Sequence, residues 1–142
     1  MRKLLLLTSL LSFFGIAKAA DFSEGQVWSY KTRPGEEQST LLINKVESHP
    51  KLGKIFHISV TNVKVKNPRL VGGVTSELPH FPVSQTTLEK SVTKVLRKSK
   101  PNAEYLEGYK EWKRAFDEGK AGIFTITVAE IIDGVETAIN KQ

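Results

Sequence analysis

The sequence contains no cysteine, so it offers neither a disulfide nor a thiolate ligand for a metal. It also lacks the cysteine to which a bacterial lipoprotein attaches its lipid at the cleavage site. No apolar run reaches the roughly 20 residues that a membrane-spanning helix needs. The chain therefore has to fold by packing alone, without covalent cross-links.

The N-terminus has the three parts of a secretory signal peptide. A basic start, Arg2 and Lys3, is followed by the apolar run 4–16 and by the small-residue site Ala17-Lys18-Ala19. The alternative, a retained membrane anchor, is disfavoured because the apolar run is short. We therefore predict a signal peptide over residues 1–20 and a periplasmic or secreted location. Residues 21–142 then form one domain with no transmembrane segment, and leader removal lowers the formal net charge of +6 by three.

Three segments rich in β-branched and aromatic residues follow the leader, at 26–33, 39–48 and 54–66. Short polar turns around Pro34-Gly35 and at 49–53 separate them, which predicts an antiparallel meander. In the third segment Phe56 and Ile58 share one face of a strand, whereas Val63 belongs to the other face. This change of phase predicts a β-bulge or a sharp bend near residues 61–62.

The second half of the chain has helical patterns. Residues 67–77 read as a loop and 79–82 as a stiff extended connector. Ser84 or Thr86 caps a first helix, whose pattern runs to residue 100. A second helix runs from the N-cap Asn102 to Gly119, and a short strand at 123–127 leads to a third helix capped by Thr127. Strands followed by helices predict an α+β fold, with the helices packed on one face of the sheet.

The second helix carries an aromatic stripe at helical spacing, formed by Tyr105, Tyr109, Trp112 and Phe116. One interpretation is an exposed stacking platform for a sugar, a peptidoglycan fragment or a nucleic-acid base. The other is a packed helix face, in which the final third of the chain supplies much of the core. Exposure of the rings distinguishes the two.

The sequence has no assembled catalytic motif. Its three histidines lack metal-ligand spacing, and it has no P-loop, dinucleotide fingerprint or EF-hand, so we expect no metal and no cofactor. The strongest catalytic candidate is His80, which lies between two prolines and near Ser84 and Glu77. These three residues contain the atom types of a serine hydrolase, although Ser84 also fits the cap of the first helix.

The first helix is expected to carry a basic stripe opposite its apolar face, formed by Lys90, Lys94, Arg97 and Lys98. Such a stripe is either solvated or faces an anionic partner, such as lipopolysaccharide, teichoic acid or an anionic membrane surface. The modest charge of the exported chain gives no reason to expect nucleic acid as a partner.

These observations favour a small exported binding protein without catalysis, such as an inhibitor or an immunity protein. Its partner would be another envelope protein or an anionic envelope polymer. One alternative is a small envelope hydrolase that uses His80 with a serine or a carboxylate. A further alternative is a structural or assembly factor of an envelope complex, which would show an apolar patch or a bare strand edge.

Overall fold

The computed structural model describes residues 21–141, so the expected signal peptide at 1–20 lies outside the described residues. Within residues 21–141 no helix has the length and apolar character needed to cross a membrane. The elements, in chain order, are β1 (Gln26–Tyr30), β2 (Thr40–His49), β3 (Gly53–Lys66), β4 (Val74–Ser84), α1 (Gln85–Ser91), β5 (Val92–Lys98), α2 (Tyr105–Asp117) and α3 (Val128–Asn140).

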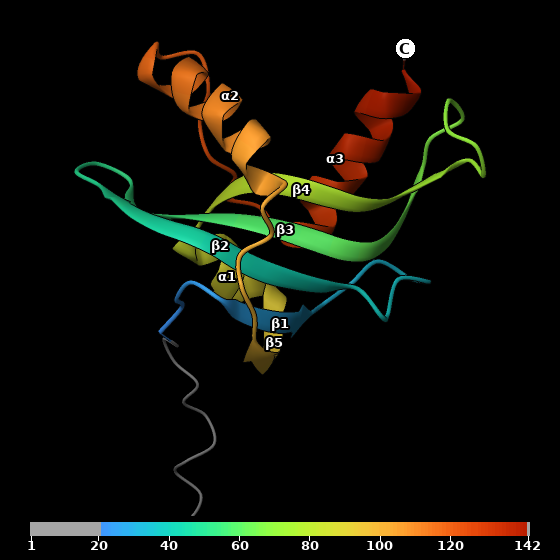
Figure 1. Ribbon diagram of the computed structural model, residues 1–142, viewed down its shortest axis with the longest axis horizontal. Coiled ribbons are helices and arrows are strands. Elements are labelled where there is room, and N and C mark those ends of the chain that lie inside the picture. The colour runs from blue at the N-terminus through green and yellow to red at the C-terminus, as the bar shows by residue number, and fades with distance from the viewer. Residues whose placement is uncertain (1–20, 142) are drawn as a thin grey trace, which may run out of the picture.

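The strands form one five-stranded antiparallel sheet in the order β4-β3-β2-β1-β5 (Figure 1). The α+β class is confirmed, and the meander is confirmed for β1 to β3. The meander continues into β4, and β5 returns to pair with β1, so the sheet has two more strands than the meander predicted from the sequence.

The extended connector predicted within residues 74–84 is part of a full strand, β4, which pairs along β3. Pro79 and Pro82 are unfavourable inside a sheet, because proline has no backbone N–H to donate to a ladder. β4 is an edge strand, where one side of the backbone has no partner strand, and prolines are tolerated there. The loop predicted at 67–77 is correspondingly shorter and joins β3 to β4.

The first helix ends at Ser91, and the predicted helical continuation is β5. The apolar spacing of Leu88, Val92 and Val95 matched a helix, but Val92 has extended backbone angles and begins the strand. The β-branched residues at 92, 93 and 95 fit a strand, and pairing with β1 supplies the hydrogen bonds. Tertiary pairing therefore overrides the local helical pattern.

The short strand predicted at 123–127 is reduced to one parallel bridge, between Phe124 and Val83 of β4. Two backbone hydrogen bonds, from Ser84 N–H to Phe124 O and from Phe124 N–H to Pro82 O, hold this segment against the end of β4. The capping box of the following helix is confirmed, with Thr127 and Glu130 bonding each other's backbone N–H.

The predicted bulge in the third strand is confirmed. Asn62 has a positive φ of 60°, and the β3–β4 pairing jumps from Thr61↔Glu77 to Val65↔Thr75. Between these two pairs β3 advances four residues while β4 advances two. The irregularity shifts the alternation along β3, so that Val63 and Val65 enter the same core as the apolar residues before the bulge.

Helices cover both faces of the sheet, which corrects the prediction of a single covered face. The principal core joins the face of β3 that carries Phe56 and Ile58 to α1 and α3. His57 points the opposite way, as alternation requires, and contacts α2. In Figure 1 the segment that leads into α2 crosses in front of β2, and α1 lies behind the sheet.

Most of the core comes from the strands. Among the described residues beyond position 100, the buried hydrophobic side chains are Trp112, Val128, Ile131 and Ile132. The final third of the chain therefore supplies less of the core than its pattern predicted, because α2 buries only one residue.

Candidate functional site

The most unusual chemistry of the molecule is a hydrogen-bonded chain of two imidazoles and a carboxylate. His57, on the α2 side of β3, is 0% exposed. Its Nε2 lies 2.8 Å from Oε2 of Glu47 on β2, and its Nδ1 lies 2.9 Å from Nε2 of His80 on β4. With neutral rings, His80 Nε2–H donates to His57 Nδ1, and His57 Nε2–H donates to the Glu47 carboxylate.

Helix α2 covers this chain. The hydroxyl of Tyr109 donates to Glu47 Oε2 at 3.1 Å, and the rings of Tyr109 and Trp112 stand edge-on to His57 with centroids 4.8 and 4.9 Å away. Trp112 Nε1–H donates to the carbonyl oxygen of Gly122 at 2.8 Å. A Cβ on Gly108 would lie 2.8 Å from the Cβ of His80, so only glycine lets the helix approach this closely.

Burial determines the charge state of the network. Burial lowers the pKa of His57, with the hydrogen bond to Glu47 acting in the opposite direction. Burial and the proximity of His57 together lower the pKa of His80 to about 4. Burial and the hydrogen bond to Glu47 raise the pKa of Tyr109 to about 12. Both imidazoles are therefore neutral at pH 7.

The structure places the three predicted hydrolase residues along β4 without joining them. Ser84 caps α1, and its Oγ accepts from Thr87 N–H at 3.1 Å. Glu77 is exposed and lies opposite Thr61 of β3. Among residues 21–141 no hydrogen bond joins any two of His80, Ser84 and Glu77. The carboxylate connected to His80 is Glu47, through His57.

Sequence reasoning missed Glu47 and His57 as partners of His80. Alternation along β3 placed His57 on the more polar face, but the proximity of Glu47 depends on the register between β2 and β3. His80 Nε2 is bonded to His57, and its Nδ1 lies 3.3 Å from where a Gly108 Cβ would stand. The close approach of Gly108 to His80 and the hydrogen bond from Tyr109 to Glu47 fasten α2 to the sheet.

The aromatic stripe of α2 is packed. Trp112 is buried, and Tyr105, Tyr109 and Phe116 are half-buried. The rings of Trp112 and Phe116 stack with centroids 4.6 Å apart, and Phe116 stands edge-on to His49 at 5.4 Å. This burial favours the packed helix face over the stacking platform.

A second buried polar group lies at the opposite end of the sheet. Glu36 is 2% exposed, and its carboxylate accepts from Arg33 at 2.9 and 2.6 Å and from Lys64 N–H at 2.7 Å. Burial alone would raise the pKa of Glu36, but the hydrogen bonds from Arg33 and Lys64 lower it below the usual value. Arg33 also bonds Asp133 and Glu136, and so ties the β1–β2 loop to α3.

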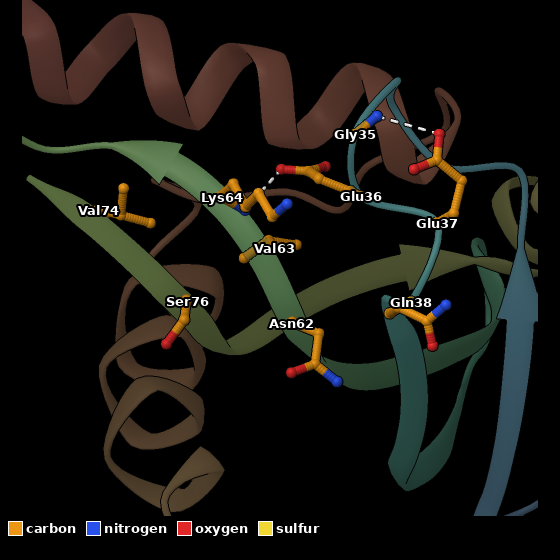
Figure 2. A pocket seen from close by; sticks show the side chains of 9 residues that line it. All are labelled: Gly35, Glu36, Glu37, Gln38, Asn62, Val63, Lys64, Val74 and Ser76. Carbon is orange, nitrogen blue, oxygen red and sulfur yellow. Dashed lines mark hydrogen bonds between the residues drawn. The ribbon is translucent and has the colours of Figure 1, made fainter.

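A cleft of about 470 Å³ adjoins this group, beside the β3 bulge. Figure 2 shows the Glu36 carboxylate turned toward the backbone of Lys64 and Glu37 turned back to the N–H of Gly35. Both carboxylates are therefore occupied by the chain itself. The cleft is lined by Gly35, Glu36, Glu37, Gln38, Asn62, Val63, Lys64, Val74 and Ser76.

The four predicted basic residues do not form a helical stripe. Lys90 lies in the last turn of α1, and Lys94, Arg97 and Lys98 lie on β5 at an edge of the sheet. All four are exposed, and among residues 21–141 none has a carboxylate within ion-pair distance. We call these four residues the basic edge.

No protein-family model matches the sequence, and neither a curated protein nor a solved structure is significantly similar to it. Within residues 21–141 no group of three or more His, Cys, Asp or Glu side chains is placed to hold a metal ion.

Proposed function

We propose that the protein is a small exported binding protein that acts without catalysis and engages an anionic partner through the basic edge. The observation that carries this proposal is the concentration of four exposed, unpaired cations around the edge strand β5. Cations that form no internal ion pairs are available to an external anion.

The position of these cations on an edge strand adds to their effect. The outer side of β5 presents backbone N–H and C=O groups that no strand of the sheet uses. Positive side chains discourage pairing with another copy of the same edge and attract a negatively charged chain instead. An anionic envelope polymer, or an acidic extended segment of another envelope protein, fits this edge.

Charge removal at the basic edge tests the proposal. We expect the variant Lys94→Gln/Arg97→Gln/Lys98→Gln to lose about tenfold or more in affinity for lipopolysaccharide, lipoteichoic acid or anionic vesicles. Wild-type affinity should fall steeply between about 50 and 200 mM salt, because exposed charges are screened.

A matched control uses three exposed lysines elsewhere, in the variant Lys51→Gln/Lys54→Gln/Lys110→Gln. It has the same net charge as the test variant, so any general effect of charge is equal in both. Equal affinities for the two variants, or binding that is insensitive to salt, would refute the role of the basic edge.

The hydrolase alternative has one observation in its favour, the hydrogen-bonded link from His80 through His57 to the Glu47 carboxylate. It requires a nucleophile beside His80, and the Ser84 hydroxyl already caps α1. Turnover of an ester, amide or glycoside probe that disappears in His80→Gln and persists in His49→Gln would support this alternative.

The assembly-factor alternative is favoured by two observations, the bare edge of β5 and an apolar groove on α3. Stable co-purification with one envelope protein, unaffected by salt, would favour it over binding of an anionic polymer. The groove is lined by Phe124, Ile126, Glu130, Ile131, Gly134, Val135 and Ala138.

A further inference from the structure

Two rows of side chains cross four strands on the α2 side of the sheet, next to the basic edge. Residues that pair directly in an antiparallel sheet share a face, and residues two apart on one strand share it as well. The strand pairings therefore define both rows. The first row is Arg97–Val27–Leu42–Ser59, and the second is Lys94–Ser29–Thr40–Thr61.

The two rows combine hydroxyl groups with a cation at one end. Hydroxyl groups dominate the second row, where the Oγ1 atoms of Thr40 and Thr61 lie 3.3 Å apart. A cation stands at the β5 end of each row, Arg97 in one and Lys94 in the other. Glu77 pairs with Thr61 at the β4 end, so the second row runs from a cation on β5 to a carboxylate on β4.

A cleft of about 180 Å³ opens on these rows. The segment after β5 forms one wall, where Asn102 N–H donates to the side chain of Asn44 at 2.7 Å. Glu77 does not line the cleft, and the lining contains no carboxylate. It is lined by Val27, Thr40, Leu42, Ser59, Thr61, Arg97, Ser99 and Asn102.

Two donors in the cleft have no acceptor among residues 21–141. Ser59 is 1% exposed, and its Oγ accepts from Asn44 Nδ2 at 3.2 Å, but its own O–H hydrogen is unused. The guanidinium of Arg97 has five N–H groups and no hydrogen-bond partner in the described part of the chain. A buried donor without a partner is unfavourable, so an acceptor that enters the cleft stabilises Ser59.

Strand spacing indicates the size of this acceptor. β3 and β5 lie three strand spacings apart, about 14 Å. Side chains stand roughly perpendicular to a sheet, so Arg97 has to lean along the face toward β3 to share a ligand with Ser59. One phosphate with a hydrogen bond on either side spans about 8 Å, and it can bridge these two residues, which line the same cleft from β5 and β3.

We infer that this cleft binds a phosphate group, as the unit of the anionic partner that the protein recognises. The inference rests on the proposed function and names the chemistry of its ligand. A tetrahedral phosphate offers oxygens in several directions, which suits two donors that reach it from different strands, Ser59 from β3 and Arg97 from β5. A planar carboxylate presents only two oxygens. Lys94 does not line the cleft, but its place on β5 opposite Ser29 adds a second positive charge on the same edge, which suits the higher charge of phosphate.

The phosphate can belong to a polymer or be free in solution. Glycerol phosphate represents the first source and inorganic phosphate the second, so comparing the two probes distinguishes them. We propose titrating the exported protein with inorganic phosphate, glycerol phosphate and acetate, and following backbone amide shifts by NMR. The two phosphate probes should shift the amides around Ser59, Arg97 and Asn102, and acetate should bind at least about tenfold more weakly.

Two variants test the contacts. Arg97→Gln changes an exposed side chain and should weaken phosphate binding about tenfold or more, and Ser59→Ala should weaken it about threefold to tenfold. Lys110→Gln is the control and should bind phosphate as the wild type does. Unchanged affinity in Arg97→Gln, or no shift of cleft amides with either phosphate probe, overturns the inference.

The same variants separate this inference from the proposed function. If Ser59→Ala binds inorganic phosphate normally while charge removal at the basic edge abolishes polymer binding, the cleft inference fails and the proposed function stands. If both phosphate probes occupy the cleft but no anionic polymer or vesicle binds, the proposed function fails and the site recognises a small phosphate.

Discussion

The histidine network predicts that the protein loses stability in mild acid. An unfolded histidine has a pKa near 6.5, whereas folding lowers the pKa of His80 to about 4. Between these values the unfolded chain binds more protons than the folded one. The stability that the neutral His80 ring contributes is therefore fully present above pH 6.5, and it is lost as the pH falls toward 4. The lowered pKa of His57 acts in the same direction.

The size of the effect follows from the pKa difference. Folding lowers the pKa of His80 from 6.5 to about 4. This difference makes the free energy of unfolding about 2 kcal/mol smaller at pH 5 than at pH 7.5. The ring of His80 is partly exposed, and solvent screening reduces the expected loss to about 1 kcal/mol. Protonation of His80 places positive charge beside His57, which itself lies near Lys45 and bonds the one carboxylate of the network, Glu47.

Urea unfolding at pH 7.5 and pH 5, followed by tryptophan fluorescence, measures this loss. His80→Gln removes the titrating group and should show a smaller difference between the two pH values, by about 1 kcal/mol. His49→Gln, which lies outside the network, is the control for the loss of another histidine. If His80→Gln retains the full pH dependence, His80 is not buried against His57 as described.

The remaining predictions concern packing and the second buried polar group. Gly134→Ala should stabilise α3 by about 0.5–1 kcal/mol, because nothing lies within 4 Å of the new Cβ and alanine favours a helix. Gly108→Ala, the matched change in α2, should instead destabilise the protein by about 1–3 kcal/mol, because the new Cβ would lie 2.8 Å from the Cβ of His80. Thermal unfolding of both variants checks the opposite signs. A stabilised Gly108→Ala variant would contradict the close contact. Arg33→Ala should cost about 3–5 kcal/mol in urea unfolding, because it leaves the buried Glu36 carboxylate without its cation. Asp133→Asn, which removes an exposed partner of the same arginine, should cost less than about 1 kcal/mol, and equal losses in the two variants would argue against the buried pair.

Features that depend on neighbouring residues in the chain were predictable. The capping box of Thr127 and Glu130, the Ser84 cap and the bulge at Asn62 each follow from the chemistry of a few consecutive residues. The α+β class followed from the order of such segments. These signals are local because a cap or a bulge forms its bonds within a few residues.

Features that depend on pairing between distant segments were not predictable. Residues 92–98 carry a helical pattern and form a strand, because β1 offers an edge with which they can pair. The side of the sheet that α2 covers depends on the path of the chain after β5. Glu47 joins His57, and His57 joins His80, only through the registers of β2, β3 and β4.

The sequence by itself determined the composition of the candidate surface: several cations between residues 90 and 98, scattered serines and threonines, and no cysteine. Only the tertiary structure decided that Arg97 and Ser59 line one cleft and that His80 is bonded within the fold. The physical reason is that side-chain alternation fixes which face a residue takes, whereas hydrogen-bond register between strands fixes which residues meet.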